Sequence, residues 1–125
     1  MLQQNRALAG IHSLLQYTLP MLIDHTTLPE RELAPGIFAR LMHGTGVTVM
    51  RVRLEPGARL PRHEHPHEQV TTVLRGHLQL VVGETVCEMG PGSTVFIPGG
   101  TPHHALAIES TDVIDMFTPV REDLR

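Results

Sequence analysis

The stretch that decides the fold reads Arg62-His63-Glu64-His65-Pro66-His67-Glu68-Gln69. Positions 63, 65 and 69 have the same parity, so an extended strand would direct all three side chains to one face. A neutral imidazole is a strong ligand for a borderline divalent ion, and a side-chain amide oxygen adds a harder donor. The stretch therefore predicts three ligands of one metal site, namely His63, His65 and Gln69.

A second stretch with histidines lies about forty residues later and reads Ile97-Pro98-Gly99-Gly100-Thr101-Pro102-His103-His104. Its glycines and prolines predict a tight turn, so an imidazole should follow directly after that turn. Adjacent residues of a strand face opposite ways, which leaves a choice between His103 and His104 as a further ligand. The two stretches together predict one mononuclear metal centre.

The composition is that of an ordinary globular domain and excludes several functions. The chain has 125 residues, 41% of them hydrophobic and 18% charged, with a net charge of -3. It is long enough for one domain with a sizeable core. The slight acidity gives no electrostatic reason to expect nucleic acid or an anionic membrane as a partner. All ten basic residues are arginine, which excludes lysine Schiff-base chemistry and leaves arginine to hold a carboxylate.

Cys87 is the single cysteine, so an intrachain disulfide and a cysteine-rich zinc site are both excluded. A lone cysteine in a β-rich run is typical of a small buried residue rather than a nucleophile. No apolar run reaches the ~20 residues that a membrane span requires. The N-terminus also lacks the pattern of a signal peptide. We therefore expect a cytoplasmic protein.

The chain divides into three regions. Residues 1–24 predict a helical extension, residues 25–36 a connector, and residues 37–125 a β-barrel domain. The helix is indicated by apolar residues at spacings of three and four: Leu8, Ile11, Leu14, Leu15, Leu19 and Leu22. Pro20 should end or kink this helix near Leu19. We expect the extension to pack on the outside of the domain or across a dimer interface.

From residue 37 onward the hydrophobic period changes to two, with turns of glycine and proline between short runs. Many short strands at close spacing favour an all-β antiparallel barrel or sandwich. The predicted strands are Ile37–Met42, Val47–Leu54, Val70–Leu74, Leu78–Val82, Thr85–Glu88, Thr94–Ile97, His104–Ile108 and Val113–Thr118.

The spacing in both histidine stretches resembles the two signature motifs of the cupin superfamily. The first motif is matched by Gly57, His63, His65, Gln69 and Gly76, and the second by Gly92, Pro98, Gly100 and His103. The resemblance covers roughly residues 37–118. It implies an antiparallel jelly-roll barrel with one metal inside, and it favours His103 over His104 as the fourth ligand.

Two positions depart from the cupin pattern. Gln69 stands where cupins commonly carry glutamate, and Ala107 stands where the second motif often ends in asparagine. A neutral third ligand leaves more net positive charge on the ion, which favours a Lewis-acid role and an anionic or hydroxyl-bearing substrate. The cofactor is expected to be one divalent ion, and the ligand types leave zinc, nickel, manganese and iron open.

Within the superfamily, the chain looks similar to small KdgF-type cupins, which open and tautomerise 4,5-unsaturated monouronates into linear keto sugars. The similarity lies in the first histidine stretch and in Asp115-Met116-Phe117-Thr118-Pro119-Val120-Arg121-Glu122-Asp123. It implies a metal held by His63, His65, Gln69 and His103. It further implies catalytic roles for Asp115 and Arg121, and substrate contacts from Phe117 and Arg121.

The residues themselves leave alternatives open at this end of the chain. Asp115 and Phe117 share a strand face, and an inward acid near a metal-bound substrate can act as general acid/base. Asp115 could instead pair with Arg51 or Arg53. Arg121 could clamp a substrate carboxylate or remain a solvated arginine of the tail.

Three classes of function remain open on this sequence. The first is a non-redox metal-dependent enzyme acting on a small carboxylated sugar. The second is an iron- or manganese-dependent dioxygenase, because three histidines and one oxygen ligand also suit O₂ chemistry. The third is a non-catalytic module that binds a sugar or another small molecule. A homodimer is expected, because the helix and sheet positions such as Val70, Leu74, Leu78 and Leu80 present more apolar surface than one barrel covers.

Overall fold

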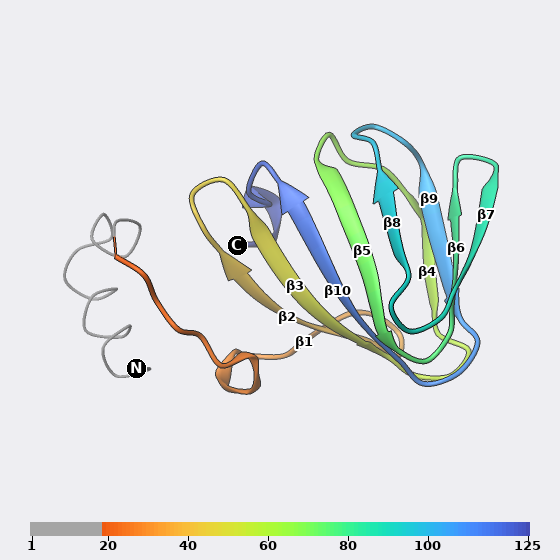
Figure 1. Ribbon diagram of the computed structural model, residues 1–125, viewed down its shortest axis with the longest axis horizontal. Helices are drawn as coiled ribbons and strands as arrows, with labels where there is room; N and C mark the ends of the chain where they lie inside the picture. Colours follow the sequence, from red (N-terminus) through yellow and green to blue (C-terminus); the bar gives the residue numbers. More distant parts are fainter. Residues whose placement is uncertain (1–18) are drawn as a thin grey trace.

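The computed structural model describes residues 19–125. Within this range ten strands form two antiparallel sheets that face each other (Figure 1). The six-stranded sheet has the order β1-β2-β3-β10-β5-β8, and the four-stranded sheet has the order β4-β9-β6-β7. The strands are β1 (Arg31–Ala34), β2 (Ile37–His43), β3 (Thr48–Leu54), β4 (Arg59–His63), β5 (Glu68–Arg75), β6 (Leu78–Val82), β7 (Thr85–Met89), β8 (Thr94–Ile97), β9 (His103–Ala107) and β10 (Thr111–Thr118).

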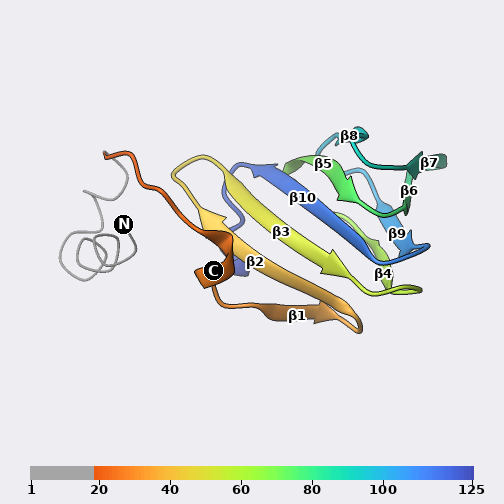
Figure 2. The ribbon, with the colours of Figure 1, turned by 60° about the horizontal axis from the view of Figure 1, so that its bottom comes forward.

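The core lies between the two sheets, which open at an angle to each other in Figure 2. Burial alternates along the central strands, as in β3 and β10, because every second side chain points inward. The inward positions are apolar, and burying them provides the main driving force for folding. Among the most buried are Ile37, Ala39, Val52, Leu54, Val73, Leu78, Leu80, Ile97, Ala107, Val113 and Phe117.

The predicted all-β antiparallel jelly roll is confirmed. All eight predicted strands are present, and their ends shift by two residues at most. Two strands were missed. β1 lies in the predicted connector and begins with two charged residues, so its β signal is weak. β4 carries Pro61 between arginines, and the proline is tolerated because β4 is an edge strand with a register shift between Leu60 and His63.

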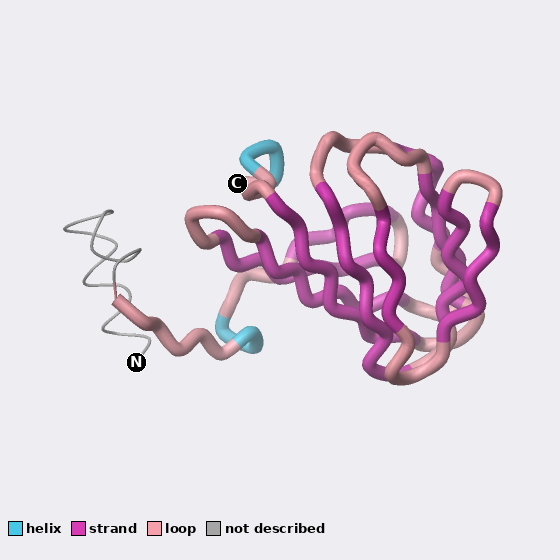
Figure 3. Tube along the Cα trace, turned by 45° about the horizontal axis from the view of Figure 1, so that its top comes forward, coloured by secondary structure: helices cyan, strands magenta, loops and turns pink. Residues whose placement is uncertain are grey.

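The predicted helix does not reach residue 24. Residues 19–24 run as an extended segment away from the sheets (Figure 1), and the rest of the predicted helix lies outside the described residues. Asp24 then caps a short 3-10 turn, His25–Thr27, by accepting a hydrogen bond from the Thr26 amide. Figure 3 shows this turn and a second one, Glu122–Leu124, as the helical segments of the described chain. Neither approaches the length or apolar character of a membrane-spanning helix.

The apolar surface that was predicted to form a homodimer contact is only partly exposed. Leu78 and Leu80 are 3% exposed and belong to the core. On the outer face of the six-stranded sheet, Val70 pairs with Met116 on one side and Phe96 on the other. Met116 and Phe96 are 42% and 53% exposed, so an apolar row crosses these strands.

The homodimer stays a prediction, now with this apolar row as the expected contact. Sedimentation velocity at micromolar concentration should give twice the chain mass. Phe96→Ser should shift the boundary toward the monomer, because it removes the largest exposed apolar side chain of the row. A parent protein that sediments as a monomer would contradict the prediction.

Candidate metal centre

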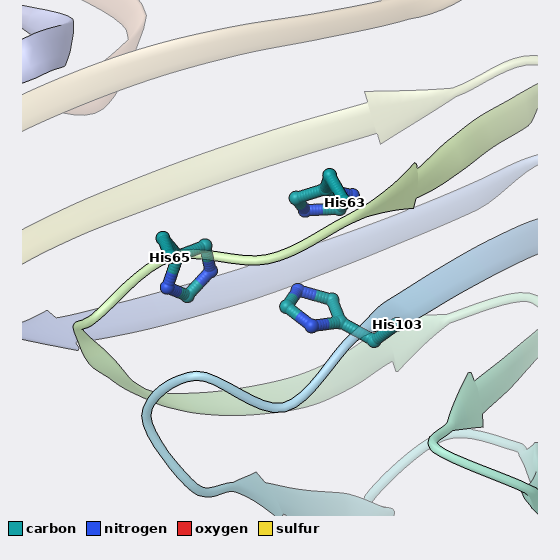
Figure 4. Close-up of side chains that lie close together, drawn as sticks. All are labelled: His63, His65 and His103. Carbon is teal, nitrogen blue, oxygen red and sulfur yellow. The ribbon is translucent and has the colours of Figure 1, made fainter.

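Three histidines converge at one end of the barrel interior (Figure 4). His63 ends β4, His65 lies in the loop after it, and His103 begins β9 directly opposite His63 in the ladder. Their nitrogen ligand atoms all lie within 4.8 Å of one another. His104 points to the other face of β9 and takes no part in this group. The choice of His103 over His104 therefore agrees with the geometry.

The prediction that these ligands converge because they share one face of a single strand was wrong. β4 ends at His63 and β5 begins at Glu68, so residues 64–67 form a loop rather than a continuation of the strand. Gln69 consequently lies on the six-stranded sheet, across the barrel interior from β4. The ligand positions are brought together by a change of sheet, and shared parity along one strand has no part in it.

Each of the three rings has its Nδ1 atom beside the carbonyl oxygen of a residue two positions away. The pairs are His63 with Pro61 at 2.8 Å, His65 with His67 at 3.0 Å, and His103 with Thr101 at 2.8 Å. A carbonyl only accepts, so in each neutral ring Nδ1 carries the hydrogen and donates it. The lone pair is thereby left on Nε2, which is the tautomer that a metal ligand requires.

His103 supplies the clearest sign that the group fits a cation. Its side chain is 2% exposed, and its Nε2 has no hydrogen-bond partner among the described residues. A buried acceptor without a donor costs free energy, which a bound cation offsets. Burial lowers the pKa of His103 to about 4 and also lowers the pKa of His65, so both rings remain neutral near pH 7. The donor set therefore fits a divalent metal ion.

Gln69, the predicted fourth ligand, lies beside His65 and points its amide oxygen at that ring. Nε2 donates to Thr71 Oγ1 at 2.9 Å and to Asp115 Oδ1 at 3.3 Å. Oε1 lies 3.0 Å from Nε2 of His65, although both atoms carry lone pairs. Two cis ligands with metal bonds of about 2.1 Å lie about 3.0 Å apart. An ion shared by Gln69 and His65 would therefore turn this contact between two acceptors into a favourable one.

Asp115 is buried behind Gln69, at 7% exposure. Its Oδ1 accepts a hydrogen bond of 2.6 Å from Thr71 as well as the longer one from Gln69. Burial raises the pKa of Asp115 to about 6, against the opposing effect of these hydrogen bonds. The alternative pairing with Arg51 or Arg53 does not occur, because both arginines project from the outer face of β3 while Asp115 projects inward.

Phe117 and Arg121 lie next to the histidines. The Phe117 ring is 2% exposed and contacts the His65 ring edge-on, with 5.6 Å between ring centres. The Arg121 guanidinium lies 4.6 Å above the Phe117 ring and forms a bidentate pair with Asp123 at 2.9 and 3.0 Å. Arg121 is only 11% exposed, so it is not a solvated tail residue. The role of Arg121 in binding a substrate carboxylate stays a prediction. In the structure its guanidinium is paired with the carboxylate of Asp123.

The two histidine stretches are joined at their loops. Gly100 donates its amide hydrogen to the carbonyl of His65 at 2.8 Å. At Gly99 the backbone approaches so closely that an added Cβ would lie 2.3 Å from the Pro66 carbonyl oxygen. The absence of a side chain at this position is therefore what lets the loop before His103 pack against the loop that carries His65.

Gly99→Ala is expected to weaken metal binding by at least about tenfold, because the clash with Pro66 separates the two ligand-bearing loops. Loss of stability by roughly 1–3 kcal/mol should accompany it, as for other overpacked sites. Titration calorimetry with Zn²⁺ and thermal unfolding measure the two effects. Gly90→Ala is the control, since a Cβ there meets nothing within 4 Å. Equal behaviour of the two variants would contradict the prediction.

A small cavity of about 50 Å³ extends from the donor set into the barrel. Its polar end is formed by Gln69, Thr71, His103 and Asp115, and apolar side chains form the rest. Typical ligand pockets begin at about 300 Å³. A cavity of this volume cannot enclose a whole sugar, so only the reacting end of one would enter it beside Asp115.

Thr71 is the member of the site that the sequence did not reveal. A threonine in a strand is an ordinary β-former, and neither signature motif includes this position. Its parity with Gln69 on β5 was the available signal, since residues 69 and 71 face the same way. His67 contributes its carbonyl to His65 and lies with its ring 5.5 Å from that ring.

Residues 50–117, more than half of the chain, match the Cupin domain family. The chain belongs to the cupin family. KdgF from Halomonas sp. has a similar structure, with a TM-score of 0.80 and 25% identity over 86% of this chain and 100% of the other. An RmlC-like cupin from Shewanella frigidimarina gives 0.79 and 21% identity over 86% and 97%. No curated protein sequence matches the chain.

A variant of oxalate decarboxylase from Bacillus subtilis shares the same fold, with a TM-score of 0.71 and 18% identity. It matches over 81% of this chain and 31% of its own length. Oxalate decarboxylase is described with Mn(II) centres. This cupin has a three-histidine group that can bind a metal, and the group itself does not fix which metal.

Proposed function

We propose that this cupin is a metal-dependent, non-redox enzyme that converts 4,5-unsaturated monouronates, small carboxylated sugars, into linear keto sugars. The observation that carries the proposal is the buried Asp115 carboxyl behind a neutral ligand set of three imidazoles and one amide. The 25% identity to KdgF from Halomonas sp., which extends over 86% of the chain, supports the substrate class.

The reaction is an isomerisation and needs no oxidant or reductant. The bond between the ring oxygen and the anomeric carbon breaks as the anomeric hydroxyl loses its hydrogen and the ring oxygen gains one, which leaves an aldehyde and an enol. The enol oxygen then loses its hydrogen as C4 gains a proton, and a ketone forms at C5. A bound metal supplies Lewis-acid polarisation of a sugar oxygen. The protein has to supply proton transfer and to hold the substrate carboxylate.

Three side chains are assigned to these tasks. Asp115 is the general acid/base, because its Oδ1 is anchored by Thr71 and Gln69 while the carboxyl group lines the cavity beside the donor set. Arg121 holds the substrate carboxylate, which then competes with Asp123 for the guanidinium. Phe117 packs against the His65 ring and the Arg121 guanidinium and excludes water from the side of each group that it contacts.

The proposal is tested by following the ultraviolet absorbance of a 4,5-unsaturated monouronate with the protein loaded with Zn²⁺ or Ni²⁺ in the absence of O₂. Loss of the absorbance with formation of a linear keto sugar supports the proposal. Turnover that requires iron or manganese and O₂ identifies a dioxygenase instead. Binding of the uronate without any turnover identifies a non-catalytic module.

A further inference from the structure

Thr71 has no step of its own in the proposed reaction, yet its hydroxyl joins the two groups on which the site depends. The side chain is 3% exposed and faces inward from β5. Its Oγ1 accepts a hydrogen bond from Gln69 Nε2 at 2.9 Å and donates one to Asp115 Oδ1 at 2.6 Å. Thr71 therefore fixes the position of Gln69 and Asp115 relative to each other.

The need for such a contact follows from the chemistry of the amide. Its oxygen can bind a metal, whereas its nitrogen carries two hydrogens and no available lone pair. In the structure Gln69 Nε2 donates toward two neighbouring oxygen acceptors, on Thr71 and Asp115, and Oε1 faces His65. The reversed amide would place Oε1 against Asp115 Oδ1, which is acceptor against acceptor.

We propose that Thr71 is a positioning residue that, through Gln69 and Asp115, keeps the amide oxygen of Gln69 directed at the metal. A carboxylate in this position has two equivalent oxygens and needs no such contact, whereas an amide does. The inference deepens the proposed function. It rests on the metal centre of that proposal and is independent of the substrate.

The test uses the full-length protein and Co²⁺, whose visible absorption reports the ligands around it. Thr71→Val keeps the shape of the side chain and removes the hydroxyl. We expect Co²⁺ to bind about 10–100-fold more weakly in titration calorimetry and to show a changed spectrum. Thr71→Ser should restore both. Thr72→Val is the matched control, because that hydroxyl bonds to Thr94 on the outer face of the sheet.

A second experiment distinguishes a positioning role of Thr71 from a role in packing alone. In the Gln69→Glu protein, Thr71→Val should change Co²⁺ affinity less than about threefold, because either carboxylate oxygen can face the ion. The inference is overturned if Thr71→Val binds Co²⁺ with the affinity and spectrum of the parent, or if it loses as much affinity in the Gln69→Glu background. A protein that binds Co²⁺ as expected but never converts a uronate refutes the proposed substrate and leaves this inference standing.

Discussion

Replacing His103 by alanine is expected to abolish tight metal binding, with an affinity loss greater than about 100-fold. His103 is the one ligand contributed by β9, and its buried Nε2 faces His63 and His65 with no other partner in the described chain. Its loss leaves two imidazoles and one neutral amide, which is a weaker ligand set than the two histidines and one carboxylate of common zinc sites. Titration calorimetry with Zn²⁺ and metal analysis of the purified protein measure the effect.

The same variant should lose the stabilisation that metal binding gives. Metal at one hundred times its dissociation constant stabilises the folded state by about 2.7 kcal/mol, which corresponds to a rise in Tm of roughly 10 °C for a domain of this size. The parent should show this rise on adding Zn²⁺ and lose it on adding a chelator. His103→Ala should show neither.

His104→Ala is the matched control for that experiment. His104 is the next residue, but it points to the opposite face of β9 and lies outside the histidine group. It should bind Zn²⁺ with the affinity of the parent and show the same rise in Tm. If His104→Ala lost binding and His103→Ala kept it, the metal centre would have to be placed elsewhere.

The sequence predicted which three histidines come together more accurately than it predicted the path of the chain between them. The spacing of His63, His65 and His103 was informative because His63 pairs with His103 across β4 and β9, and the short loop after β4 places His65 beside them. The argument from parity failed because β4 ends at His63. A strand that contains Pro61 and two arginines has a weak sequence signal, so its end could not be predicted. Period-two burial, by contrast, placed Asp115 and Phe117 correctly on the inner face of β10.

The hydrogen bonds inside the site could not be predicted from the sequence, and the reason is a different one. The contact of Thr71 with Asp115 depends on the pairing of β5 with β10, in which Thr71 lies directly opposite Asp115. Such a register joins residues more than forty positions apart. Strand parity limits each of them to one face of the sheet, and only the assembled sheet makes them neighbours.

Asp115→Asn is expected to lower kcat/KM for the unsaturated uronate by about 10²–10⁴-fold, the range typical of losing a general acid/base. This corresponds to about 3 to 5 kcal/mol in the activation barrier. The Asn side-chain oxygen can still accept the hydrogen bonds from Thr71 and Gln69, so the amide of Gln69 remains held. Zn²⁺ affinity should therefore stay within a few fold of the parent, and turnover and binding should separate.

Asp112→Asn is the control for this variant, since Asp112 lies on the same strand but outside the barrel, where it pairs with Arg75 at 2.8 Å. It should retain full turnover. Undiminished turnover in Asp115→Asn would remove Asp115 from proton transfer and leave it as an anchor for Gln69. Because Thr71→Val disturbs the anchor and keeps the carboxyl group, comparing the two variants assigns the loss of activity either to the missing acid or to a misplaced ligand.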